Sequence, residues 1–198
     1  MKKALNLLGV MVMLGMLLGV AKADQLAFTA TLTGSQEVPP NASPGVGSAL
    51  VTLDTATNLL TINVSFAGLL SPTVAAHIHC CTPPGANAMV ATQVPTFPGF
   101  PLGVTTGTYL QTFDLTLAST YNPAFITAHG GTVAGAQAAF IAGLLSGQTY
   151  LNIHTMQFPG GEIRGQLVNG EVPEPATLLL MGTGLMAAVG AIRKRTKR

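Results

Sequence analysis

One stretch near the C-terminal end, residues 150–167, constrains the fold of this chain more than any other. Its sequence, YLNIHTMQFPGGEIRGQL, contains two short runs of alternating apolar and polar residues, separated by Pro159-Gly160-Gly161. Alternation with period two is typical of a β-strand, and proline followed by glycine is typical of a tight turn. We therefore expect a β-hairpin that buries its aliphatic residues. The opposite face would present Tyr150, Asn152, His154, Glu162, Arg164 and Gln166.

Similar alternation recurs along the preceding sequence. The expected strands are residues 26–32, 49–53, 60–66, 73–79 and 107–117. On the strand at 73–79, Val74, Ala76 and Ile78 would share the inward face. A short helix is expected at 132–146, where apolar residues follow helical spacing, and a long loop at 80–103. Short strands separated by turn signals predict an all-β domain, built as a Greek-key β-sandwich or barrel with one short helix.

Both ends of the chain combine an apolar run with basic residues. The first run ends at the small-residue site Ala21-Lys22-Ala23, which is typical of a secretory signal peptide at 1–23. An uncleaved anchor helix is the alternative. The second run, at 176–192, is just long enough for a transmembrane helix, and the basic tail after it should stay cytoplasmic. The motif before this second run is Val172-Pro173-Glu174-Pro175.

Charge separates these ends from the body of the chain. The formal net charge is +2, but eight of the nine basic residues lie in the terminal segments. Between residues 24 and 170, Arg164 stands against five acidic residues, so this body carries a formal charge of −4 with neutral histidines. One cation cannot neutralise several phosphates, which excludes nucleic-acid binding. The 147 residues of the body suit one domain with its own core.

Side chains that could bind a metal ion are expected on one face of three strands. His77 and His79 alternate on one strand, so both imidazoles would point to the same side. If this strand lies near the hairpin, His154 completes a three-nitrogen set suited to copper or zinc. Asn152 and Glu162 are candidate partners for the second nitrogen of an imidazole. The alternative is that the histidines are only polar residues on an exposed strand face.

The remaining candidate residues allow several interpretations. Glu162 and Arg164 could pair with each other or bind backbone carbonyls, and Arg164 could also contact an anionic ligand. Cys80 and Cys81 could form a vicinal disulfide, an intermolecular disulfide, or soft ligands for Cu(I). We expect a disulfide, because an exported chain enters an oxidising compartment. His129 lies beside two glycines in a loop and is expected to have no special role.

Two resemblances to known families rest on these motifs. The VPEP motif, the apolar run and the basic end resemble the PEP-CTERM sorting signal of Gram-negative bacteria, which a membrane exosortase recognises and cleaves. The body resembles the CHRD domain, named from chordin, a secreted antagonist of growth factors, and the likeness spans nearly all of 26–168. The motifs that carry this second resemblance are GSQEVPP at 34–40, AHIH at 76–79, YLNIHT at 150–155 and PGGEIRGQL at 159–167.

These resemblances imply an organisation and a location. Beside the signal peptide expected at 1–23, they imply a CHRD domain at 24–170 and a PEP-CTERM segment at 171–198. They also imply export across the inner membrane and a place at the cell surface or in the extracellular matrix. The implied partners are an exosortase, the membrane through the C-terminal helix before processing, and extracellular polysaccharide or surface proteins. No established catalytic activity follows from them.

An analogy at the level of the fold connects the chain with copper-zinc superoxide dismutase. A strand H-x-H, a later strand histidine and an arginine near the end of a Greek-key barrel also describe that enzyme. The expected sandwich or barrel is therefore immunoglobulin-like or superoxide-dismutase-like. The sequence lacks an evident zinc subsite and, apart from Arg164, basic residues that could steer superoxide. We expect a non-enzymatic binding or structural module with a candidate copper site, and a redox-active copper enzyme is the alternative.

Overall fold

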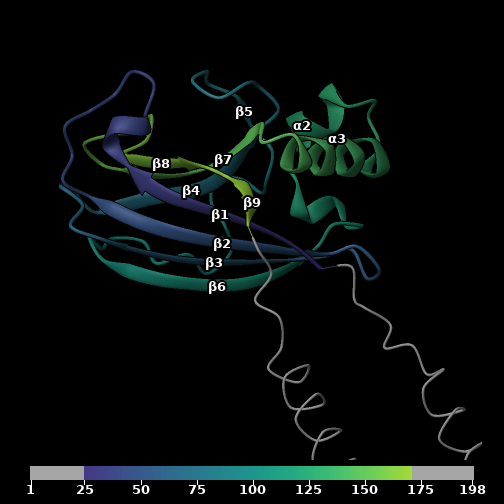
Figure 1. The fold of residues 1–198 in the computed structure, drawn as a ribbon, viewed down its shortest axis with the longest axis horizontal. Helices are drawn as coiled ribbons and strands as arrows, with labels where there is room; N and C mark the ends of the chain where they lie inside the picture. The colour runs from purple at the N-terminus through teal and green to yellow at the C-terminus, as the bar shows by residue number, and fades with distance from the viewer. Residues whose placement is uncertain (1–24, 171–198) are drawn as a thin grey trace, which may run out of the picture.

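Nine antiparallel strands form one sheet in the computed structural model, which describes residues 25–170 (Figure 1). The hydrogen-bonded order is β5-β4-β7-β8-β1-β2-β3-β6, and β9 also pairs with β1. The strands are β1 (Gln25–Thr33), β2 (Val46–Asp54), β3 (Leu59–Ala67), β4 (Thr73–Cys80), β5 (Met89–Val90), β6 (Gly107–Asp114), β7 (Thr149–Thr155), β8 (Ile163–Gln166) and β9 (Val168–Gly170).

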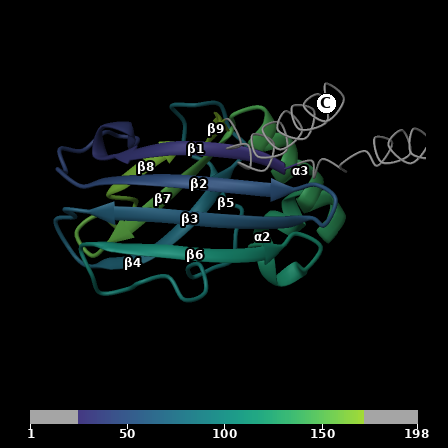
Figure 2. The same cartoon turned by 60° about the horizontal axis from the view of Figure 1, so that its bottom comes forward.

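The sheet curls, so that its two ends face each other. Figure 2 shows β1, β2, β3 and β6 side by side, with β4 and β7 crossing behind them at an angle. The alternating apolar residues of the strands fill the space between, and burial of each large one stabilises the fold by about 1.5–3 kcal/mol. The fully buried members include Phe28, Val51, Ile62, Ile78, Leu151 and Ile153. The predicted β-rich class is therefore confirmed as a curled antiparallel sheet.

Two α-helices lie together beyond one end of the sheet (Figure 1). Helix α3 (Val133–Leu145) corresponds to the helix predicted at 132–146, and the Thr132 side chain caps its first turn. Helix α2 (Pro123–Ala128) was not predicted, because its six residues are too few for a periodic pattern. Two short 3-10 helices complete the described elements, η1 (Gly34–Gln36) and η2 (Ala118–Thr120).

A β-bulge changes the start of β4. The register of β4 against β7 shifts between Thr73 and Ala75. A bulge adds one residue on one strand and reverses the alternation beyond it. Val74, which the sequence pattern assigned to the inward face with Ala76 and Ile78, is therefore 43% exposed. The prediction was wrong for Val74 and correct for the other two residues, which are fully buried.

The predicted terminal segments lie outside the described residues. They are the signal peptide at 1–23, the Val172-Pro173-Glu174-Pro175 motif, the transmembrane helix at 176–192 and the basic tail. Within residues 25–170, no helix combines the length and the apolar character needed to cross a membrane.

Candidate metal centre

Strands β4, β7 and β8 are neighbours in the sheet, which brings the predicted polar residues to one face. Asn152 of β7 lies opposite His77 of β4 on one side and opposite Arg164 of β8 on the other. His154 lies opposite Ala75, two residues further along the same pair of strands. The polar side chains therefore gather on the face that points away from the apolar core.

Three imidazoles form a compact cluster on this face, and we call His77, His79 and His154 the histidine trio. One ring nitrogen from each residue lies within 4.8 Å of the others. The ring centroids are 5.2 Å apart for His77 and His154, 5.8 Å for His79 and His154, and 6.0 Å for His77 and His79. All three side chains are buried, with 6–8% of their surface exposed.

A backbone carbonyl fixes each imidazole of the trio. Because a carbonyl oxygen only accepts, the ring nitrogen that contacts it must carry the proton. The remaining nitrogen of each neutral ring then keeps its lone pair. These remaining nitrogens, His77 Nδ1, His79 Nε2 and His154 Nε2, are buried and have no hydrogen-bond partner. The accepting carbonyls are Pro95 for His77 Nε2 at 2.7 Å, Ala88 for His79 Nδ1 at 2.9 Å and Pro159 for His154 Nδ1 at 3.0 Å.

Burial keeps the trio neutral at physiological pH. Removal from water disfavours the charged ring and lowers the pKa of His77 to about 4, and the neighbouring His154 adds to this effect. Burial likewise lowers the pKa of His79 to about 4 and lowers the pKa of His154. Neutral imidazole is the form that binds a metal ion. The trio can therefore coordinate a metal ion without first releasing a proton.

Loops cover the face that carries the trio. The segment 82–103 supplies the carbonyls of Ala88 and Pro95, and the turn between β7 and β8 supplies that of Pro159. Every residue of β7 is buried, because these loops cover one face of the strand and the hydrophobic core packs against the other. The alternative placed the histidines on an exposed strand face; this exposure is wrong, because the loops cover that face.

Glu162 does not contact the trio as the sequence pattern suggested. Its carboxylate, with no exposed surface, accepts hydrogen bonds from Ser43 Oγ at 2.6 Å, Leu70 N at 2.6 Å and Thr155 Oγ1 at 2.7 Å. The expected partners of the imidazoles were Glu162 and Asn152, whereas the actual partners are carbonyl oxygens. Glu162 instead joins two loops to the end of β7.

Arg164 also has its hydrogen bonds within the protein. Its Nε donates to the carbonyl of Gln36 at 2.5 Å, and its Nη1 donates to Asn87 Oδ1 at 2.9 Å. The guanidinium lies 4.5 Å above the ring of Tyr150, which stacks in turn on His79 with centroids 4.7 Å apart. Arg164 therefore ties the loop at η1 to the loop after β4, next to one ligand candidate.

Glu37 is a polar residue of this region that the sequence pattern alone did not mark. Its side chain is 5% exposed, it contacts the Asn152 amide, and the charge of Arg164 acts on it. Burial raises the pKa of Glu37 to about 7, although Arg164 and Asn152 act in the opposite direction. Its place in GSQEVPP, one of the motifs that carry the resemblance to the CHRD domain, was the available signal.

Cys80, Cys81 and His129 lie outside the trio. The two cysteines form a disulfide between adjacent residues. Their sulfur atoms face α3, near the Ala139 carbonyl, and do not belong to the cluster that could hold a metal. The interpretation of the cysteines as soft copper ligands is therefore not supported by their position. His129 Nδ1 donates a hydrogen bond to the Phe125 carbonyl at 2.8 Å, at the end of its own helix.

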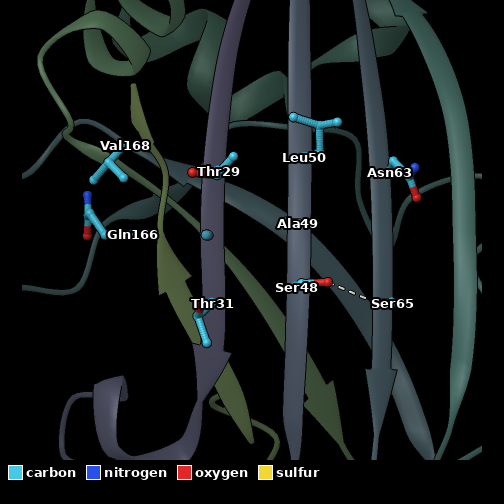
Figure 3. A pocket seen from close by; sticks show the side chains of 10 residues that line it. Thr29, Thr31, Ser48, Ala49, Leu50, Asn63, Ser65, Gln166 and Val168 are labelled. Carbon is cyan, nitrogen blue, oxygen red and sulfur yellow. Dashed lines mark hydrogen bonds between the residues drawn. The ribbon is translucent and has the colours of Figure 1, made fainter. Parts of the chain in front are cut away.

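A separate open hollow lies on the outer face of β1, β2 and β3, with a volume of about 550 Å³. Figure 3 shows hydroxyl and amide side chains along it, with Ser48 and Ser65 bonded to each other at 2.9 Å. Its lining residues are Thr29, Ala30, Thr31, Ser48, Ala49, Leu50, Asn63, Ser65, Gln166 and Val168. None of them is titratable or a usual metal ligand, so the trio is the stronger candidate site.

The motifs of the trio lie inside a region that matches a known family. A family model of the CHRD domain matches residues 28–167. The chain belongs to the CHRD family. The matched region contains every strand that bears a trio residue and the GSQEVPP loop with Glu37. Comparison with curated proteins and with solved structures finds no match.

The end of this CHRD protein matches a second family model, the PEP-CTERM protein-sorting motif, at residues 171–195. The motif implies sorting by an exosortase. It is consistent with export and surface localisation in a Gram-negative bacterium. Both resemblances described from the sequence are thus confirmed.

Proposed function

We propose that this CHRD protein is an exported surface protein whose domain, residues 24–170, is a non-enzymatic binding module that holds one copper ion. His77, His79 and His154 would be the ligands. The observation that carries the proposal is the set of three buried ring nitrogens without hydrogen-bond partners. A buried polar atom left unsatisfied costs about 1–3 kcal/mol. A metal ion bound to all three would remove that cost.

The donor set favours copper. Three imidazole nitrogens without a thiolate or carboxylate suit copper or zinc, whereas magnesium and calcium prefer oxygen ligands. Among divalent ions, a nitrogen site generally binds Cu²⁺ more tightly than Zn²⁺. The carbonyl partners of the imidazoles would hold the rings in place and fix their tautomers, as outer hydrogen bonds do in known metal sites.

The hydrogen bonds of Arg164 and Glu162 within the protein support binding rather than catalysis. Arg164 donates to Gln36 and Asn87 and stacks on Tyr150, so its guanidinium is occupied in holding the loops. The carboxylate of Glu162 is bonded to three donors. Both side chains are therefore used in joining loops and strands of the fold.

A metal titration tests the proposal. The full-length chain, purified in detergent, is titrated with Cu(I), Cu(II) and Zn(II), and the stoichiometry and affinity are measured. We expect about one copper ion per chain. In His77→Ala/His79→Ala and in His154→Ala the affinity should fall by more than the roughly 10–100-fold that loss of an outer hydrogen bond costs.

His129→Ala is the matched control, since it removes an imidazole that lies outside the trio. It should bind copper like the wild-type protein. If the folded wild-type protein binds none of the three ions, or if the trio variants bind as tightly as the wild type, the proposal is wrong.

A redox-active copper enzyme is the second candidate function. The observation in its favour is that three ligands leave a coordination position open, as in catalytic metal sites. Superoxide turnover by the copper-loaded protein, absent in His154→Ala, would favour this candidate over the binding module.

The same proposal covers processing of the chain. We infer a signal peptide at 1–23 and a transmembrane sorting helix at 176–192, with exosortase acting near Val172-Pro173-Glu174-Pro175. The match to the PEP-CTERM motif at 171–195 supports this inference.

A further inference from the structure

Two further buried oxygens lack a hydrogen-bond partner beside the trio. They are Glu37 Oε1 and Asn152 Oδ1, on side chains that are 5% and 2% exposed. Both lie close to the backbone of Gly161: a Cβ added there would be 2.6 Å from Glu37 Oε1 and 2.5 Å from Asn152 Oδ1. Gly161 also has a φ of 131°, so only glycine fits this position well. Two buried acceptor oxygens without a hydrogen-bond partner therefore lie around one tight space, beside the Nδ2 of the Asn152 amide.

A proton on Glu37 would supply the missing donor. A protonated carboxyl has one O–H group, whereas an ionised carboxylate can only accept. Burial favours this protonated form, because it raises the pKa of Glu37 to about 7. The charged group that acts on Glu37 is Arg164 of β8, and the imidazoles of the trio on β4 and β7 are neutral at that pH.

Asn152 connects Glu37 with the proposed ligands. Its amide contacts Glu37, its backbone lies opposite His77, and it precedes His154 by two residues on β7. Glu37 is thus separated from the trio by a single side chain, in surroundings with little water. Charges act over longer distances in such a place than in bulk water.

We propose that Glu37 releases its proton when a divalent metal ion binds to the trio. The carboxylate that remains then offsets part of the positive charge of the metal ion. This inference rests on the proposed metal site. The reaction is M²⁺ plus Glu37–COOH giving bound M²⁺, Glu37–COO⁻ and H⁺, with no change in oxidation state. The metal's charge favours the carboxylate, and the carboxylate in turn favours the divalent ion. Metal affinity at this site is then coupled to pH through Glu37.

Proton release can be measured by calorimetric titration of the full-length chain with Zn²⁺, a divalent ion without redox chemistry. Titrations at pH 7 in two buffers of different ionisation enthalpy give the number of protons released per metal ion. Glu37 is about half protonated at that pH, so the wild-type protein should release roughly half a proton more than Glu37→Gln. The trio should release almost none, because its imidazoles are already neutral.

Asp54→Asn is the matched control, because Asp54 is a carboxylate outside this cluster whose turn hydrogen bonds an amide oxygen can also accept. It should release as many protons as the wild type. Equal proton release by Glu37→Gln and wild type would overturn this proposal while leaving the metal site intact. Failure of the wild type to bind Zn²⁺ at all would overturn both.

A second measurement on the wild-type protein avoids dependence on the variant. The infrared carbonyl band of a protonated carboxylic acid should be present in the metal-free protein at pH 7 and should weaken when Zn²⁺ is added. A carboxyl with a purely structural role would keep its band, and an unchanged band in the metal-bound protein would contradict the proposal.

Discussion

Single hydrogen bonds decide what the residues of the trio can do. Each imidazole donates one N–H to a carbonyl oxygen, and the nitrogen left over is buried without a partner. Glu162, by contrast, accepts hydrogen bonds at both carboxylate oxygens. The buried nitrogens without a partner therefore mark the candidate metal site. The carboxylate of Glu162, which has its hydrogen bonds, has a structural role.

The hydrogen bonds of the Glu162 carboxylate lead to a prediction about stability. Glu162→Ala would leave the buried Thr155 hydroxyl without its acceptor and would also remove the acceptor of the part-buried Ser43 hydroxyl and Leu70 N–H, so it should destabilise the fold by about 3 kcal/mol. Glu162→Gln keeps one oxygen acceptor and should cost about 1–2 kcal/mol. Denaturant unfolding of each variant gives these values. As a control, Asp114→Asn alters an exposed carboxylate and should stay within about 0.5 kcal/mol of wild type. Wild-type stability of Glu162→Ala would contradict this account.

Among the secondary-structure elements, the contact between α3 and β4 depends on one residue without a side chain. Gly143 lies against the disulfide of Cys80 and Cys81, and an added Cβ would clash with the Cys80 sulfur and lie 3.3 Å from Thr149 Cγ2. A disulfide sulfur cannot swing aside as the end of a long side chain can. The helix therefore approaches the end of β4 only because residue 143 is glycine.

Substitution of this glycine should separate the helix from the strand. Alanine is normally favoured over glycine inside a helix by about 1 kcal/mol, but the overlap with the disulfide should cost more. We expect Gly143→Ala to destabilise the protein by roughly 1–3 kcal/mol in denaturant unfolding without reductant. Gly160→Ala, where no atom lies within 4 Å, should change stability little. A smaller cost of Gly143→Ala in a Cys80→Ala/Cys81→Ala background would locate the effect at the disulfide, and an equal cost would argue against it.

The sequence predicted the strands better than it predicted the loops that cover them. The strands around Ile78, Leu151 and Ile153 followed from alternation, because burial of one strand face is a local pattern. The bulge at Val74 leaves no signal in that pattern, because a bulge changes register without changing composition. The positions of Glu37 and of the loop carbonyls depend on contacts between segments far apart in the chain. The polar face could therefore be predicted, but not its burial or its hydrogen bonds.

On the scale of the whole molecule, the buried titratable groups couple folding to pH. Folding lowers the pKa of His77 and His79 from an ordinary 6.5 to about 4, and it also lowers that of His154. The unfolded chain therefore binds more protons than the folded protein between those values. Glu37 acts in the opposite direction, because its pKa rises from 4.5 to about 7 on folding. Three histidines take up protons on unfolding and one glutamate releases one, so the unfolded chain binds more protons in total.

Stability of the metal-free protein should consequently fall as pH decreases from about 6.5 toward 4. The expected slope near the middle of this range is on the order of 1–2 kcal/mol per pH unit. Denaturant unfolding at several pH values measures it, and His77→Gln/His79→Gln should show a shallower slope. A stability that stays constant or increases on acidification across this range would contradict the burial of neutral imidazoles.

The central claim is that three imidazoles of the CHRD domain bind one metal ion, and X-ray absorption of the copper- or zinc-loaded full-length chain tests it most directly. The account predicts about three imidazole nitrogens near 2.0–2.1 Å and no sulfur near 2.3 Å, where thiolate ligands lie. His129→Ala should give the same spectrum, whereas His154→Ala should lose the signal of the bound site. A sulfur ligand, or a spectrum without imidazole scattering in the wild-type protein, would show that the trio is not the metal site.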